Sequence, residues 1–171
     1  MTAVLAVRRL PFKAAPIAAL LIMAALFAAR TADDDATSSP PSVVGEALTI
    51  LTADGTTARL QAEIAESLEQ RSQGLMRRTS LAPDSGMLFI IEPPGRGFWM
   101  KDTPLSLTVA FIADCGEIVD FADLDPLSEE VKNTEGRYVF ALEMERGWFA
   151  ANQVAVGDVI QLPQRLQAGG C

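Results

Sequence analysis

Hydrophobic and polar residues alternate along several short stretches of the chain, and this pattern predicts β-strands. From Thr57 onward, Ala, Leu and Ile occupy every second position, and Thr, Arg, Gln and Glu occupy the positions between them. A period of two places one set on a buried face and the other in water. A second apolar run, 47–53, precedes it, and Asp54-Gly55 is a strong signal for a two-residue hairpin turn. We therefore expect an antiparallel hairpin that ends near Ala65.

Further short apolar runs, each bounded by turn residues, predict additional strands. Their lengths suit strands that are buried in a sheet, because helices of globular domains are usually longer. These runs cover residues 86–91, 98–100, 105–112, 117–121, 138–144 and 159–162.

Helical signals are few and short. Ser67 stands three residues before Gln70, which is a capping-box pattern for a helix that runs to about Arg78. Gly74 lies inside this segment and weakens a helix by about 1 kcal/mol relative to Ala, so the helix ends or bends there. Residues 147–152 are expected to form one helical turn.

Many short strands with turn signals and one or two short helices indicate a mainly β fold. We expect one β-rich domain over residues 45–165, built as a β-sandwich or a partly closed barrel. Segments 92–97 and 123–136 are rich in turn-forming or polar residues and are expected to be loops. Residues 166–171 are expected to be a flexible tail.

The N-terminus resembles a targeting segment. Arg8, Arg9 and Lys13 precede an apolar stretch over residues 14–29 that contains no acidic residue. Its 16 residues are short for a membrane span but suit the hydrophobic region of a signal peptide. Residues 1–30 are therefore expected to be a signal peptide or an N-terminal membrane anchor, and the pattern decides neither its cleavage nor its export route.

Residues 31–44 differ sharply from the apolar stretch before them. They contain three consecutive aspartates and a run of Ser, Thr and Pro. Such a composition buries too little apolar area to offset the entropy lost on ordering, so a disordered linker is expected. Together with the leader, it predicts a domain that is exported, periplasmic or anchored to the outer face of the cytoplasmic membrane.

Residue counts exclude several kinds of catalytic and metal-binding site. It has no histidine, which excludes Ser-His-Asp triads, Cys-His pairs and imidazole-bound zinc, and its two cysteines are too few for a Cys₄ site. Residues 31–171 carry a net charge of −12, so we expect no nucleic-acid partner. In an oxidising compartment Cys115 and Cys171 are free to pair, although the sequence does not show whether they lie within reach.

Three motifs in the middle of the chain are similar to a known signature. They are Gly-Leu-Met-Arg-Arg at 74–78, Gly-Met-Leu-Phe at 86–89 and Phe-Trp-Met-Lys-Asp-Thr at 98–103. They resemble the uncharacterised protein family number 0127, also called domain-of-unknown-function family 192. The match continues to about residue 163. The resemblance implies a small β-rich domain, often exported or membrane-anchored, with no established activity.

Two positions depart from the family pattern. Asp102 stands where the family usually has Asn, and Thr108 stands where it usually has Asp. One carboxylate is lost and another is gained nearby. A mechanism that requires the usual Asp is therefore not expected in this chain.

A dense set of polar and aromatic residues surrounds these motifs and is our candidate ligand-binding rim. An indole face stacks on sugar rings and cations, and a guanidinium binds carboxylates through two hydrogen bonds. If the residues share one edge of the sheet, they suit a small ligand such as a sugar or a carboxylated molecule. The alternative is structural, with Arg78–Asp84 and Lys101–Asp102 as ordinary ion pairs and Trp99 in the core. The proposed rim consists of Arg77, Arg78, Trp99, Lys101, Asp102 and Thr103.

Catalysis is the second hypothesis. Asp84, Asp102 and Glu143 are candidates for the paired carboxylates that a carbohydrate-active hydrolase or lyase uses. Glu143 is equally compatible with an outward-facing strand position. The sequence shows no recognisable arrangement of nucleophile and base. We therefore favour a non-enzymatic binding or accessory module for a small-molecule or cell-envelope ligand over an enzyme, and a purely structural domain is the third hypothesis.

Methionines give a weaker signal for a metal. Thioethers bind Cu(I), with Cys115 as a candidate further ligand, but methionine more often fills gaps in apolar cores. The candidates are scattered rather than spaced as ligands, so we predict no metal and no cofactor. They are Met76, Met87, Met100 and Met144.

Overall fold

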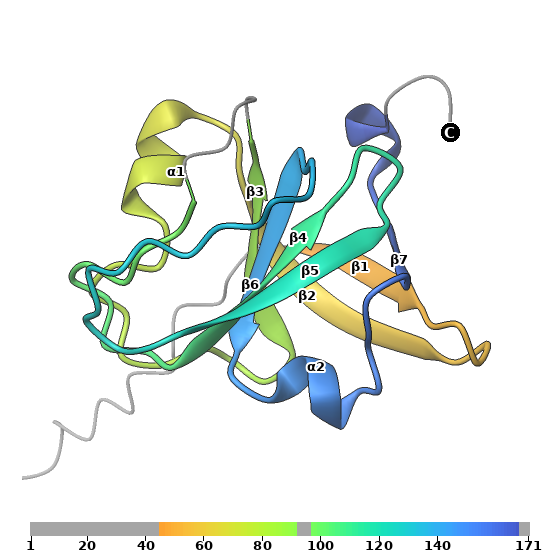
Figure 1. The fold of residues 1–171 in the computed structure, drawn as a ribbon, viewed down its shortest axis with the longest axis horizontal. Helices are drawn as coiled ribbons and strands as arrows, with labels where there is room; N and C mark the ends of the chain where they lie inside the picture. The colour runs from red at the N-terminus through yellow and green to blue at the C-terminus, as the bar shows by residue number, and fades with distance from the viewer. Residues whose placement is uncertain (1–44, 92–96, 168–171) are drawn as a thin grey trace, which may run out of the picture. The chain divides into compact units, whose positions relative to one another are not determined.

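The computed structural model of the chain describes residues 45–91 and 97–167. The expected leader (1–30), the expected linker (31–44) and most of the expected C-terminal tail lie outside these ranges. The described strands form one seven-stranded sheet with the order β5-β4-β6-β3-β2-β1-β7 (Figure 1). The sheet curls into a half-barrel, which confirms the predicted mainly β, partly closed architecture.

The predicted hairpin is present, but residues 52–56 separate its strands instead of the predicted two-residue turn. Strands β1 (Glu46–Leu51) and β2 (Thr57–Ala65) pair antiparallel. In the turn, the Asp54 carboxylate accepts hydrogen bonds from the hydroxyls of Thr52 and Thr56 and from the Thr56 N–H. Gly55 has a φ of 85°, a conformation that glycine adopts without steric cost. The turn chemistry therefore fixes the register of the pair.

The predicted capping box starts the first helix, but the helix is shorter than expected. In α1 (Leu68–Gln73) the Ser67 hydroxyl accepts the Gln70 N–H, and the Gln70 side chain accepts the Ser67 N–H. The helix stops at Gly74, whose φ is 48°. Of the two predicted outcomes at this glycine, termination is therefore the one observed, and the chain does not remain helical to Arg78.

The centre of the sheet is buried on both faces. Strand β3 (Ser85–Ile90) lies parallel to β2, and β6 (Phe140–Glu145) runs antiparallel between β3 and β4 (Leu107–Ile112). The parallel pair needs a crossover, which α1 and the following loop provide. Nearly every residue of these three strands is buried, so their apolar runs are continuous rather than alternating.

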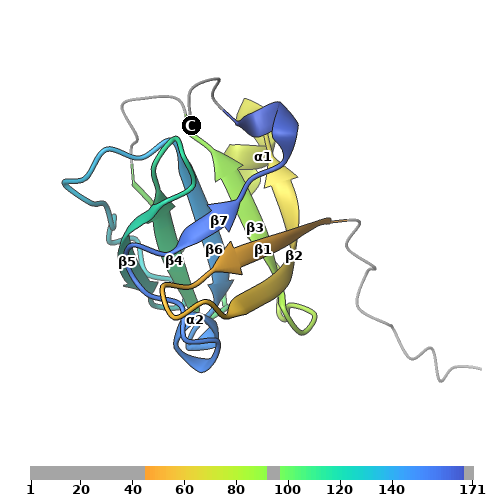
Figure 2. The same ribbon diagram turned by 90° about the vertical axis from the view of Figure 1, so that its right-hand side faces the viewer.

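The two edge strands approach each other and nearly close the barrel. Strand β7 (Val159–Gln161) pairs with β1, and the Ile160 N–H donates to the Gly116 carbonyl just before β5 (Ile118–Leu124). Figure 2 shows β7 between β1 and β5. A Cβ at Gly116 would lie 2.3 Å from the Ile160 carbonyl oxygen. The closure therefore requires glycine at this position.

Several predicted boundaries shift in the structure. The predicted strand at 98–100 is reduced to one isolated bridge, between Phe98 and Lys132. Strand β4 begins two residues later than predicted, and β5 extends to Leu124 instead of residue 121. The expected helical turn is α2 (Trp148–Ala151), and a short 3₁₀ helix, η2 (Gln164–Leu166), follows β7.

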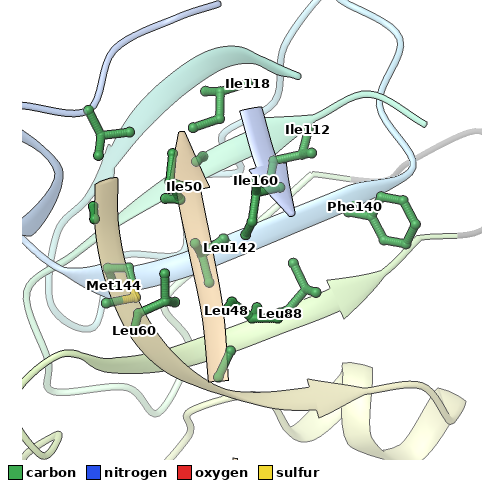
Figure 3. Packing of buried hydrophobic residues seen from close by; sticks show 14 of the residues in the cluster. Leu48, Ile50, Leu60, Leu88, Ile112, Ile118, Phe140, Leu142, Met144 and Ile160 are labelled. Carbon is green, nitrogen blue, oxygen red and sulfur yellow. The ribbon is translucent and has the colours of Figure 1, made fainter. Parts of the chain in front are cut away.

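Two apolar clusters lie on opposite faces of the sheet. The inner cluster fills the half-barrel, and Figure 3 shows Leu48, Ile50 and Ile160 pointing toward Leu142 of β6. The outer cluster lies on the other face and is covered by loops. It includes Leu75, Met87, Phe89, Phe98, Met100, Leu107, Val109, Phe111, Leu124, Tyr138 and Ala141.

Aromatic rings join the covering loops to the outer face. Phe98 contacts Phe89 and Phe111 edge to face, with ring centroids 5.2 Å and 6.0 Å apart. Phe111 packs against Tyr138 in the same way, at 4.9 Å. These contacts fix the loop that carries the candidate rim. In the two described ranges, no helix has the length and apolarity to cross a membrane.

Candidate functional site

The rim motif alternates between buried and exposed side chains although it is not a strand. Phe98 and Met100 are buried in the outer cluster, whereas Trp99 and Lys101 between and after them point to solvent. Trp99 has 44% of its surface exposed. Trp99 is therefore not a core aromatic, and the structural alternative for this residue is excluded.

The loop that carries this motif meets two other loops. We call the three together the loop junction, which consists of residues 74–78, 97–103 and 125–132 (left side of Figure 1). The Arg77 N–H donates to the Asp102 carbonyl at 2.7 Å, and the Leu127 N–H donates to the Thr103 carbonyl at 3.0 Å. The Met100 N–H donates to the Ser128 carbonyl at 2.8 Å. Backbone hydrogen bonds therefore hold the rim from both sides.

The backbone of the loop junction is unusual. Arg77, Asp102 and Leu127 are not glycines, yet their φ values are 63°, 53° and 60°. Asp and Asn tolerate this left-handed conformation, whereas Arg and Leu adopt it rarely. Such residues persist only where surrounding contacts determine their conformation, and they are enriched at functional sites. The junction is thus a pre-organised structure and not a loosely held loop.

Four of the six predicted rim residues are exposed on the loop junction: Arg77, Trp99, Lys101 and Asp102. The Lys101 ammonium nitrogen lies 5.3 Å from the centroid of the Trp99 ring, within the range of a cation–π contact. The arrangement combines one indole face, two cations and one carboxylate.

The other two predicted rim residues support the loops instead. Arg78 forms a bidentate ion pair with Glu63 of β2, which raises the pKa of the guanidinium further above its ordinary value. Arg78 therefore pairs with Glu63 and not with Asp84, the partner expected under the structural alternative. Thr103 is buried, and its hydroxyl donates to the Lys101 carbonyl at 3.1 Å. Neither side chain is free to contact a ligand.

Asp84 lies elsewhere. Its carboxylate accepts a hydrogen bond from the Trp148 indole N–H of α2 at 2.8 Å, and its carbonyl accepts the Gln61 N–H. These contacts attach the loop before β3 to α2 and β2. Asp84 therefore contacts other elements than Asp102 does, although the sequence analysis proposed the two as members of one carboxylate pair.

Glu143 occupies the most unusual environment of the three candidate catalytic carboxylates. It is 5% exposed and lies in β6 directly opposite Met87 of β3 and Val109 of β4. Residues directly opposite in a sheet share a face, so Glu143 projects into the outer cluster. Within the described residues its carboxyl group has no hydrogen-bond or ion-pair partner, and burial raises its pKa to about 8. The outward-facing alternative for Glu143 is wrong.

A pocket of about 360 Å³ opens at the end of the same sheet face. Leu107 of β4 and Glu145 of β6 are opposite each other and both line it. The Arg146 guanidinium at its edge binds the Asp125 carboxylate at 2.8 Å. Sequence reasoning missed this pocket because three separate segments form it. Its lining is Thr79, Ser80, Leu81, Leu105, Ser106, Leu107, Glu145 and Arg146.

Comparison with protein families agrees with the motifs and the fold. The sequence model of DUF192, an uncharacterized ACR family, matches residues 49–162. The chain belongs to the DUF192 family. No curated protein matches the chain.

Two solved structures resemble this DUF192 chain over most of their length. One is a protein from Sinorhizobium meliloti 1021 that is described as a candidate transcription regulator, with 36% sequence identity and a TM-score of 0.63. The match covers 68% of this chain and 92% of that one. The other is a protein of unknown function from Novosphingobium aromaticivorans DSM 12444, with 26% identity, a TM-score of 0.65 and coverages of 72% and 89%.

The methionines of this DUF192 chain do not converge. Met87 and Met100 lie in the outer cluster, whereas Met144 belongs to the inner cluster on the opposite face of the sheet. A common thioether site for these three is therefore excluded. Within residues 45–91 and 97–167, no group of three or more acidic or cysteine side chains is close enough to hold a metal ion.

Proposed function

We propose that this DUF192 chain is an exported, non-enzymatic binding module whose loop junction holds an acidic sugar. The observation that carries the proposal is the exposed Trp99 indole, with the Lys101 ammonium over its ring, on a backbone fixed by its neighbours. Large exposed aromatic side chains beside paired polar groups are typical of binding sites.

The chemistry of the junction suits a ring that carries a carboxylate. A sugar ring stacks on the indole through its C–H face, and Lys101 and Arg77 supply cations for the carboxylate. In the free protein the ammonium lies over the indole. A carboxylate draws it away from the ring and uncovers the stacking surface. The Asp102 carboxylate is then available to accept a sugar hydroxyl.

Export is supported by two features outside the rim. Residues 1–30 have the charge and hydropathy pattern of a signal peptide or anchor. Cys115 is half of a disulfide bond, which suits an oxidising compartment such as the periplasm. The chain's other cysteine, Cys171, lies outside the described residues.

A nucleic-acid-binding role is the second candidate, because one relative is described as a candidate transcription regulator. The charge of this chain opposes it. Residues 31–171 carry a net charge of −12, and binding to phosphate backbones depends on clustered cations. Retention of the full chain on heparin at low salt would support this second candidate, and we expect none.

The acidic-sugar proposal is tested by calorimetric titration of the full chain with matched sugars. We expect glucuronate and N-acetylmuramate to bind more tightly than glucose and N-acetylglucosamine, which lack the carboxylate. Trp99→Ala should abolish binding of all four, and Lys101→Gln should remove the preference for the acids. Lys132→Gln is the matched control, since Lys132 lies in the same junction but pairs with Glu130.

The variants also show how the proposal fails. Equal binding by folded Trp99→Ala and the parent chain would contradict it, as would the absence of any binding at millimolar sugar. The fold of each variant is checked by circular dichroism and thermal melting, so that loss of structure is not mistaken for loss of affinity.

A further inference from the structure

We propose that the pocket at the end of β4 and β6 is a second site, which takes an organic cation with an apolar body and uses Glu143 and Glu145 as its acidic groups. The proposal is independent of the acidic-sugar site. It starts from Glu143, a nearly buried residue whose carboxyl group has no hydrogen-bond or ion-pair partner among the described residues and keeps some contact with solvent.

The sheet register places Glu143 next to the pocket. Leu107 and Glu145 form one cross-strand pair and both line the pocket, and Val109 and Glu143 form the next pair on the same face. Residues two apart in a strand are separated by about 7 Å. Glu143 is not part of the lining, but its side chain begins one cross-strand pair away from Glu145 on the same face, so a cation bound beside Glu145 is within reach of both carboxyl groups.

The surroundings of Glu143 leave its carboxyl group without compensation. Its two cross-strand neighbours are Met87 and Val109, and the loops over this face contribute Leu75 and Met100 to the same apolar cluster. No fully buried side-chain oxygen of the described residues lacks a partner, so the unpaired Glu143 oxygens keep some contact with solvent. A carboxyl group that is nearly buried and yet unpaired is still costly. Its raised pKa agrees with this environment.

The charge of the pocket determines whether it favours a cationic or an anionic ligand. Arg146 is the one cation in the lining, and its guanidinium lies 2.8 Å from Asp125 and 3.9 Å from Asp123. Its charge is therefore compensated outside the pocket. Glu145 is exposed and has no ion-pair partner among the described residues. The pocket thus presents net negative charge to a ligand.

The rest of the lining selects the body of the ligand. Leu81, Leu105 and Leu107 supply an apolar wall, and Ser80 and Ser106 supply hydroxyls. The volume of about 360 Å³ is at the small end of the range for small-molecule sites. A primary ammonium on a short alkyl or aromatic body fits this combination. An inorganic cation would leave the leucine wall unused.

Binding of such a cation should be coupled to loss of a proton. Before binding, Glu143 retains its proton at pH 7 because its surroundings are apolar. An ammonium beside it stabilises the carboxylate, so the proton is released to solvent. The charged groups on this face are Glu145 on the same strand, the Arg146–Asp125 pair at the pocket edge and the Glu63–Arg78 pair, which lies beyond Met87 in the same row as Glu143. The strands on both sides contribute uncharged residues.

The experiment is calorimetric titration of the full chain with hexylammonium at pH 7, repeated in buffers of different ionisation enthalpy. We expect millimolar or tighter binding with release of close to one proton per ligand, and at least tenfold weaker binding of 1-hexanol and hexanoate. Glu143→Gln should abolish the proton release and weaken hexylammonium at least tenfold. Glu145→Gln should weaken binding and keep the proton release.

Controls make each outcome decisive. Glu117→Gln alters an exposed glutamate outside the pocket and should change neither quantity. A carbon-13 titration of the Glu143 carboxyl in the unmodified chain should show its pKa falling when hexylammonium is added, which does not depend on the folding of a variant. Equal binding of hexanol, no binding of hexylammonium, or proton release that survives Glu143→Gln would each overturn the proposal.

Discussion

The two faces of the sheet are built differently. The inner cluster is formed mostly by strand residues that face one another across the half-barrel, and its members are apolar. The outer cluster takes a third of its buried residues from loops, and these covering loops contain left-handed Arg77, Asp102 and Leu127. It also contains the uncompensated carboxyl of Glu143. The inner face therefore stabilises the fold, and the outer face carries the features that stability alone does not explain.

The largest expected effect is on the pH dependence of stability, and it belongs to the outer face. In the unfolded chain Glu143 titrates near its ordinary value of 4.5, whereas burial raises the folded pKa to about 8. Between these values the folded protein keeps a proton that the unfolded chain releases. The free energy of unfolding should therefore fall with rising pH by up to about 1.4 kcal/mol per unit, and by roughly 5 kcal/mol in total.

Glu143→Gln removes this titration. Urea denaturation of the parent and variant at pH 5, 7 and 9 should give unfolding free energies that diverge in favour of the variant as pH rises. Parallel profiles across the whole range would mean that the Glu143 carboxyl is solvated in the folded protein. The same profiles for Leu142→Ala, one residue away on the inner face, should run parallel to the parent.

The next largest effect is the loss of stability when a cavity is made on either face of the sheet. Leu142→Ala on the inner face and Met100→Ala on the outer face both remove buried apolar groups and should each cost about 2–4 kcal/mol. Only Met100→Ala should also weaken sugar binding, because Met100 anchors the loop that carries Trp99. Denaturation and calorimetry on both variants test this. A loss of affinity in Leu142→Ala would remove the distinction between the faces.

Elements that depend on neighbouring residues were predicted from the sequence better than the packing of the outer face. The hairpin and the capping box depend on residues a few positions apart, so turn and cap chemistry identified them. The burial of Glu143 could not be predicted, because β6 is covered on both faces and its apolar run does not alternate. The pocket was missed because residues 79–81, 105–107 and 145–146 meet only in the folded chain.

A smaller effect is expected from the ion pair that supports the loop junction. Arg78 and Glu63 are both about one-quarter exposed, at 29% and 26% of their side chains. Exposed and half-exposed pairs contribute little, so Glu63→Gln should destabilise the chain by about 1 kcal/mol or less. Thermal melting at low and high salt checks the value, because salt should reduce the difference between the parent and the variant. A loss of several kcal/mol would show that the pair holds the junction together.

The smallest effect separates the backbone role of Asp102 from its charge. Its φ of 53° and its carbonyl contact with the Arg77 N–H are both compatible with Asn, which also tolerates the left-handed conformation. Asp102→Asn should therefore change stability by less than about 0.5 kcal/mol. Asp102→Val should cost more, because a β-branched residue is strained there. If Asp102→Asn also leaves glucuronate affinity unchanged, the carboxylate contributes nothing to the rim, and the position serves to shape the loop that presents Trp99.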